Sequence, residues 1–188
     1  MKTIGVLALQ GDFAEHLNIL NQIPGVSARP IKNPSELAHL SGLVIPGGES
    51  TVMGKMLAEE NWRAEITKQN QRGMGIYGTC AGCILLAKQV DSPYSLKLID
   101  ITVKRNAYGR QTESFIAPLS SKIFPNLSGV FIRAPLITTI NSPQVQILAT
   151  HHNTPVLVAQ HNILAGTFHP ELTGDNNVHR HFIKKFCS

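Results

Sequence analysis

The sequence predicts an α/β fold in which helices cover both faces of a mainly parallel sheet. In the first half, short apolar segments alternate with segments whose apolar residues recur at helical spacing. Such alternation is typical of parallel strands joined by helices. In the second half, short apolar segments follow one another, which predicts antiparallel strands added to the sheet. The 188 residues show no internal repeat or linker, so we expect one domain over residues 1–188.

The first half begins with a buried strand at residues 3–9, after which Asp12 is expected to cap a helix that ends before Pro24. The further elements expected there are strands at 26–31, 43–45 and 74–77, a short helix at 34–40, and helices at 51–60, 62–71 and 81–89. In the second half, partial alternation between residues 96 and 103 indicates a half-exposed strand. We then expect strands at 130–132, 145–148, 156–158 and 163–167, and a final helix at 177–186.

The composition excludes several classes of protein. Hydrophobic residues make up 43% of the chain and charged residues 15%, which excludes a disordered chain. Apolar runs of about six residues are too short to span a membrane. The net charge is +5, but the basic residues are scattered and only 6% of residues are aromatic, so no nucleic-acid partner is expected. Three cysteines form no disulfide framework, which indicates a cytoplasmic protein.

The segment from Gly78 to Gly82 joins an expected strand to an expected helix and contains Cys80. Gly-x-Cys-x-Gly at such a junction is typical of a nucleophile elbow that carries sulfur in place of oxygen. The sharp turn leaves no room for side chains beside the nucleophile, which explains the two glycines. A cysteine at the start of a helix is favoured as thiolate. We therefore predict that Cys80 is a nucleophile.

Cys80 and Cys83 also form a Cys-x-x-Cys pair, so a thiol oxidoreductase remains an alternative. The apolar residues 84–86 that follow are typical of a core helix. A zinc site is less well supported, because the chain has no second cysteine pair. A binding subunit without catalytic activity is a third reading.

A base for the thiol is expected at His169. Pro170 biases His169 toward extended backbone, in which residues two apart point the same way. Glu171 can then hold the imidazole in one tautomer and orientation. The rival pair, His151 and His152, stands beside a turn and is interpreted as solvated.

A glycine turn at Gly47 and Gly48 lies between an expected strand and an expected helix, where exposed N–H groups can bind an oxyanion. Ser50 or Thr51 is expected to cap the helix that follows. Arginine side chains match carboxylates with two hydrogen bonds, so the segment Arg105-Asn106 and Arg133 are candidates for binding a substrate carboxylate.

Three segments together resemble the class I glutamine amidotransferases: residues 46–51, 78–82 and 169–171. Further segments resemble a narrower family, the glutaminase subunits of pyridoxal 5′-phosphate synthase. These matches are residues 7–11 with Glu15-His16, residues 105–111, and residues 131–135. The resemblance runs from about residue 4 to residue 173. It implies a flavodoxin-like three-layer sandwich.

The resemblance also implies an activity, the hydrolysis of L-glutamine to L-glutamate and ammonia. Cys80 matches the family nucleophile, His169 the base and Glu171 the residue that orients it. The positions that match glutamine-contacting residues are Gly47, Gly48, Glu49, Ser50, Arg105, Ile132 and Arg133. The oxyanion would be bound by N–H groups near Gly47, Gly48 and Ala81.

The family passes ammonia to a separate synthase subunit that makes the vitamin B6 cofactor. The resemblance therefore implies a hetero-oligomer with that subunit. It implies no metal and no organic cofactor for the hydrolysis itself.

Overall fold

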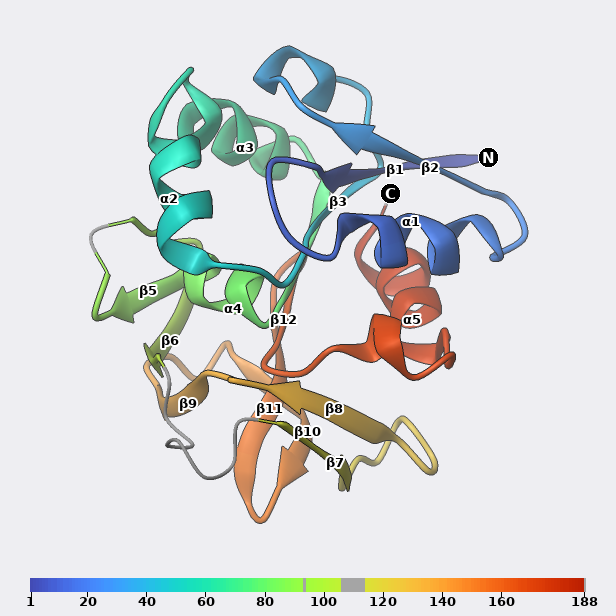
Figure 1. Cartoon of the computed structure of the whole chain (residues 1–188), viewed down its shortest axis with the longest axis vertical. Helices are drawn as coiled ribbons and strands as arrows, with labels where there is room; N and C mark the ends of the chain where they lie inside the picture. Colours follow the sequence, from blue (N-terminus) through green and yellow to red (C-terminus); the bar gives the residue numbers. More distant parts are fainter. Residues whose placement is uncertain (93, 106–113, 188) are drawn as a thin grey trace.

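The computed structural model describes residues 1–92, 94–105 and 114–187. Within these ranges, the main sheet has seven strands in the order β10-β11-β12-β4-β3-β1-β2 (Figure 1). Their bounds are Lys2–Leu7 (β1), Val26–Ile31 (β2), Gly42–Ile45 (β3), Gly75–Thr79 (β4), Gln146–His151 (β10), Thr154–Gln160 (β11) and Ile163–Gly166 (β12). Strands β2, β1, β3, β4 and β12 pair in parallel, whereas β11 pairs antiparallel with β12 and β10.

Helices cover both faces of this sheet, so the molecule has three layers (Figure 1). Helices α1 (Phe13–Asn21) and α5 (Asn177–Phe186) lie on one face. Helices α2 (Ser50–Ala58), α3 (Trp62–Gln71) and α4 (Ala81–Leu86) lie on the other. No helix in the described ranges is both long enough and apolar enough to cross a membrane.

The two faces of the sheet bury separate sets of side chains. In β3, Leu43 and Ile45 belong to the core under α2, α3 and α4, whereas Val44 belongs to the core under α1 and α5. This division follows from the alternation of side chains along a strand. In α5, Val178 and Phe182 are buried four residues apart, as expected for a helix with one apolar face.

Two smaller sheets lie beside the main one. Strands β5 (Ala87–Val90), β6 (Ile99–Lys104) and β9 (Leu136–Ile140) form the first. Strands β7 (Ser114–Pro118) and β8 (Ser128–Ile132) form the second. Short 3₁₀ helices occupy Pro34–Leu37 (η1) and Pro170–Leu172 (η2).

The predicted α/β class with a mainly parallel sheet is confirmed, and three local predictions are wrong. The helix expected at 81–89 ends at Leu86, because residues 87–90 pair with β6 as a strand. The strand expected in the main sheet at 130–132 belongs to β8, which pairs with β7. The helix expected at 34–40 is a single 3₁₀ turn.

Candidate active site

Loops that follow β1, β3 and β4 meet at one edge of the main sheet, where the carboxyl ends of its parallel strands lie. They enclose a cavity of about 440 Å³. Residues predicted as site residues line much of it: Gly48, Glu49, Ser50, Cys80, Ala81, Arg105, Ile132, Arg133 and His169. The cavity also has lining residues to which the sequence assigned no site role: Gln10, Gly11, Asp12, Ile84 and Leu172.

Cys80 occupies a sharp turn between β4 and α4. Its φ of 47° and ψ of −102° are a strained combination for a residue with a side chain. A Cβ on Gly78 would lie 2.6 Å from the Gly82 backbone, and a Cβ on Gly82 would lie 2.1 Å from the Ile45 carbonyl oxygen. The expectation that only glycine fits on either side of Cys80 is therefore confirmed.

His169 lines the cavity and lies against Glu171, which stands behind it. Nδ1 of His169 is 2.7 Å from Oε1 of Glu171, and both side chains are almost fully buried. The backbone that brings them together is a 3₁₀ turn beginning at Pro170, and not the extended segment that the sequence predicted. The backbone N–H of His169 donates to the Val130 carbonyl at 2.8 Å, which anchors this turn to β8.

The charge state of His169 is set by its neighbours. Burial lowers the pKa of His169, but interactions with the Asp12 carboxylate and the Cys80 thiol outweigh it and raise that pKa to about 12. The hydrogen bond with Glu171 adds to the rise. Burial raises the pKa of Glu171, and the contact with His169 partly offsets this effect. The site therefore favours an imidazolium that can give a proton to a group near the sulfur of Cys80.

Asp12 contributes to this site in a way that the sequence did not predict. Asp12 is the N-cap residue of α1, as expected, but its side chain makes no capping hydrogen bond to the helix. Instead, Oδ2 of Asp12 lies 3.4 Å from Nδ1 of His169, and this contact lowers the pKa of Asp12. The position of Asp12 in the loop that follows β1, at the same sheet edge as Cys80, is the signal that could have revealed it.

Asp12, His169 and Glu171 also offer three ligand atoms within 4.8 Å of one another, a set that could hold a metal ion. In this structure the same atoms are already engaged, since Nδ1 of His169 is at hydrogen-bonding distance from Glu171. Their geometry is that of an oriented histidine between two carboxylates.

The glycine turn packs directly against His169. A Cβ on Gly47 would lie 2.4 Å from Cε1 of the imidazole, and Gly48 has a φ of 152°. The Gly47 carbonyl accepts a hydrogen bond from the Asp12 N–H at 3.1 Å. The backbone N–H of Glu49 donates to Oε1 of Gln10 at 2.8 Å. These contacts tie the turn to the loop that follows β1.

Glu49, and not Ser50 or Thr51, caps α2. Its carboxylate accepts hydrogen bonds from the backbone N–H groups of Thr51 at 3.1 Å and Val52 at 3.0 Å. These bonds, the Thr51 bond most of all, lower the pKa of Glu49. A carboxylate at a helix N-terminus also interacts favourably with the helix dipole.

Both candidate arginines reach the cavity. Arg105 donates to Oγ1 of Thr51 at 3.0 Å and lies 3.9 Å from Oε1 of Glu49, so its guanidinium is held at the rim. Arg133 is exposed and has a φ of 42°. Its neighbour Ile132 places a carbonyl oxygen 3.8 Å from Sγ of Cys80. Asn106 and the rest of the segment to residue 113 lie outside the described residues.

Cys83 faces away from the cavity. It is fully buried in the core under α2, α3 and α4, and this burial raises the pKa of its thiol. The three cysteines, all in the described part of the chain, are free. An inaccessible thiol that resists ionisation is a poor partner for thiol exchange, so the geometry disfavours the oxidoreductase alternative.

The expectation that His151 is a solvated turn residue is wrong. Its ring is half-buried and lies 5.7 Å, centroid to centroid, from each of Phe115 and Phe131. His152 is exposed, as expected. The pair lines a separate cavity and stands apart from Cys80.

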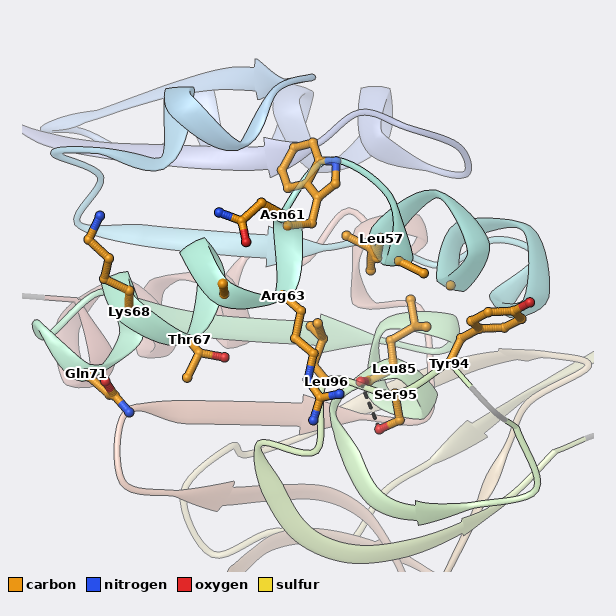
Figure 2. Close-up of a pocket in the computed structure, with 14 residues that line it drawn as sticks. Leu57, Asn61, Arg63, Thr67, Lys68, Gln71, Leu85, Tyr94, Ser95 and Leu96 are labelled. Atoms are coloured by element: carbon orange, nitrogen blue, oxygen red, sulfur yellow. Dashed lines mark hydrogen bonds between the residues drawn. The ribbon is translucent and has the colours of Figure 1, made fainter.

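A larger cavity of about 620 Å³ lies between α2, α3 and residues 94–96 (Figure 2). Apolar side chains such as Leu57 and Leu96 and the long side chains of Arg63 and Lys68 line it. It contains none of the site residues predicted from the sequence. Size alone therefore does not mark the functional site, and the smaller cavity at Cys80 contains the reactive groups.

The chain is similar to known proteins over almost its whole length. The model of the SNO glutamine amidotransferase family matches residues 6–188. A pyridoxal 5′-phosphate synthase subunit PdxT of Pasteurella multocida is 49% identical over 184 residues, which cover 96% of this chain and 95% of that protein. The PdxT subunit of Listeria welshimeri is 45% identical over 188 residues, covering 98% of this chain and 99% of that protein.

Solved structures give the same result. A crystal structure of a glutamine amidotransferase superposes with a TM-score of 0.91 at 42% identity, covering 96% of this chain and 97% of that one. A glutamine amidotransferase of Thermotoga maritima superposes with a TM-score of 0.63 at 14% identity, covering 98% of this chain and 84% of that one, and therefore shares the fold. The flavodoxin-like layering expected from the sequence and the match over almost the whole chain agree: this chain belongs to the SNO glutamine amidotransferase family.

Proposed function

We propose that this protein hydrolyses L-glutamine to L-glutamate and ammonia, with Cys80 as nucleophile, His169 as acid and base, and Glu171 as the residue that orients His169. One observation carries the proposal. A cysteine held in a strained elbow shares a cavity with an imidazole whose far nitrogen is hydrogen-bonded to a buried carboxylate. Such an arrangement suits acyl transfer through a thioester.

In the first half of the reaction, the Cys80 thiolate attacks the side-chain amide carbon of glutamine. Backbone N–H groups near Gly47, Gly48 and Ala81 stabilise the oxyanion that forms. The His169 imidazolium gives its proton to the leaving nitrogen, which departs as ammonia when the C–N bond breaks. A thioester between glutamate and Cys80 remains, and His169 is now neutral.

In the second half, neutral His169 removes a proton from water as the water oxygen attacks the thioester. The C–S bond breaks and releases glutamate, which restores the Cys80 thiolate and the His169 imidazolium. The buried carboxylate of Glu171 stays ionised while the imidazole gains and loses its proton. It therefore keeps Nδ1 of His169 protonated and Nε2 directed at the reacting atoms.

The rim of the cavity supplies groups for the amino-acid end of glutamine. Arg105 and Arg133 offer guanidinium groups to the substrate α-carboxylate. Gly48, Glu49, Ser50 and Ile132 line the same space and complete the proposed glutamine site. Gly47 stands just behind it, against His169.

Replacing Arg105 with alanine is expected to raise the KM for glutamine about tenfold and to change kcat less, because a charged hydrogen bond distant from the reacting amide is lost. Steady-state kinetics of glutamate formation measure both constants. Arg63→Ala is the matched control, since Arg63 lines the other cavity. A fall in kcat at unchanged KM would show instead that Arg105 acts in the transition state.

We further propose that residues 1–188 act as one glutaminase domain in the cytoplasm and that their partner is the synthase subunit of pyridoxal 5′-phosphate synthase. The names of the relatives support this partner, since they are PdxT subunits of that synthase. Ammonia released into water is mostly protonated and loses its nucleophilicity. Hydrolysis is therefore useful beside an acceptor site, which this chain would find on its partner.

The synthase subunit is expected to stimulate glutamate release about a hundredfold, because one oxyanion-hole donor contributes about that factor. The Gly47–Gly48 peptide is the proposed switch. Its carbonyl accepts a hydrogen bond from the Asp12 N–H. Glycines permit the peptide plane to flip at little cost in free energy. Turnover at saturating glutamine, with and without the synthase subunit, measures the effect. Equal rates would refute activation, and the absence of glutamate in both would refute the proposed function.

A further inference from the structure

A chain of buried polar side chains runs from Glu171 away from the cavity to α5. His16 of α1, His179 of α5 and Thr79 of β4 form it, and all three are completely buried. Nδ1 of His16 is 2.9 Å from Nε2 of His179, and Nε2 of His16 is 3.0 Å from Oγ1 of Thr79. The same Nε2 atom is 3.4 Å from Oε2 of Glu171. Nothing in the proposed reaction has yet used this chain of contacts.

The contacts determine in which direction the protons point. Among the residues that the structure describes, Nδ1 of His179 and Oε2 of Glu171 form no regular hydrogen bond, although Oε2 lies 3.4 Å from Nε2 of His16. If His16 donated to His179, the neutral ring of His179 would carry its proton on Nδ1, as a buried donor without an acceptor. The lone pair on Nε2 of His16 would then face the Glu171 carboxylate and repel it.

The opposite direction removes the repulsion and leaves Nδ1 of His179 as an unpaired acceptor in place of an unpaired donor. Nε2–H of His179 donates to Nδ1 of His16, so that Nε2 of His16 carries the proton and presents it to Oγ1 of Thr79 and Oε2 of Glu171. Burial holds the pKa of His16 well below its usual value, and burial lowers the pKa of His179 to about 3. Both rings are therefore neutral at physiological pH, and His16 presents a single N–H group in one fixed direction.

This N–H group matters because two carboxylates compete for the same nitrogen of His169. Nδ1 of His169 has two carboxylates near it, Glu171 at 2.7 Å and Asp12 at 3.4 Å. Glu171 lies in a buried environment that disfavours its charge, whereas Asp12 is partly exposed. Without a donor at Oε2, the Glu171 carboxyl group would turn or take up a proton, and the imidazole would turn toward Asp12.

We propose that His16, itself oriented by His179, is a positioning residue that fixes the Glu171 carboxylate and thereby the direction of the His169 imidazole. This inference rests on the proposed function, because it concerns the same three reacting residues. It assigns a role in the reaction to two helices, α1 and α5, that do not reach the reacting atoms.

Two similar polar substitutions test it. In His16→Gln, the side-chain amide can reach the place of Nε2 and donate to Glu171. In His16→Asn, the shorter amide reaches only the place of Nδ1, next to His179. With the partner subunit present, we expect His16→Asn to lower kcat about tenfold or more at nearly unchanged KM, and His16→Gln to retain most of kcat. A purely structural role would not separate the two variants in this way.

A variant at the other end of the chain gives independent evidence. His179→Phe keeps an aromatic ring beside Tyr77, whose ring centroid is 5.8 Å from that of His179, but removes the donor to His16. We expect a smaller fall in kcat, again at unchanged KM. If His16→Asn does not fold, as judged by its circular dichroism and unfolding midpoint, His179→Phe decides the question.

The rate at which iodoacetamide alkylates Cys80, measured without glutamine, separates this inference from the proposed function. It should fall in His16→Asn and stay near the wild-type rate in His16→Gln. Wild-type protein that releases no glutamate would refute the proposed function, while the alkylation rates would still test the positioning role. Equal kcat losses and equal alkylation rates in the Asn and Gln variants, or an unchanged kcat in His179→Phe, would overturn the inference.

Discussion

Replacing Cys80 with alanine is expected to abolish glutamate formation while the fold stays intact. Alanine has no group that can form the thioester, so we expect a loss of at least about 10⁴-fold in kcat. The substitution keeps the Cβ atom and therefore adds no backbone strain at the φ of 47°. Glutamate release with the synthase subunit present measures the loss, and circular dichroism reports the fold. A folded Cys80→Ala protein that still turned over would refute the assignment of the nucleophile.

Cys83→Ser is the matched control, since it changes a thiol three residues away that is fully buried. Its hydroxyl would stand in apolar surroundings, so we expect the free energy of unfolding to fall by about 1–3 kcal/mol. The glutaminase rate should remain close to that of the wild type. If this variant lost activity while folded, or if a Cys80–Cys83 disulfide proved necessary for turnover, the oxidoreductase reading would be favoured.

His169→Asn is expected to lower kcat nearly as much as Cys80→Ala does. Asparagine can neither give a proton to the leaving nitrogen nor accept one from water, and both steps need the same group. The raised pKa of His169, about 12, means that the proton for the first step is already in place at neutral pH. Single-turnover and steady-state rates of glutamate formation measure the effect.

Glu171→Gln separates orientation from proton transfer. The amide oxygen can still accept the hydrogen bond of His169, but the negative charge that stabilises the imidazolium is gone. We therefore expect kcat to fall about a hundredfold, which is a smaller loss than that of His169→Asn. If Glu171→Gln proved more damaging than His169→Asn, the roles assigned to the two residues would be wrong.

Much of the fold could be predicted because it depends on local patterns. The buried segment 43–45 and the glycines around Cys80 follow from periodicity and from steric requirements that neighbouring residues reveal. The end of α4 could not be predicted in this way. Residues 87–90 contain good helix formers, but they pair with β6, and Lys88 forms an ion pair with Asp100. Tertiary pairing outweighs the weak intrinsic preference for helix.

The candidate site likewise combines residues that local sequence patterns reveal with residues that only tertiary contacts bring together. Cys80, His169 and Glu171 are recognisable because their spacing along the chain is part of their chemistry. Asp12 precedes a helix and has the residue type of a cap, yet its carboxylate contacts a residue 157 positions later. His16 and His179 lie 163 positions apart. Contacts of this kind depend on how the layers stack, and no local pattern in the sequence reports them.

The strained backbone conformation of Cys80 sets thermal stability against activity at this position. A side chain at this φ and ψ lowers the free energy of unfolding by about 1–3 kcal/mol. Glycine would avoid this strain, although the greater freedom of its unfolded chain would offset about 0.5–1 kcal/mol of the gain. The most stable residue at position 80 is thus one that cannot perform the reaction. A library screened for thermal tolerance alone would drift toward an inert protein at this position. Only a screen that also demands turnover would retain the cysteine.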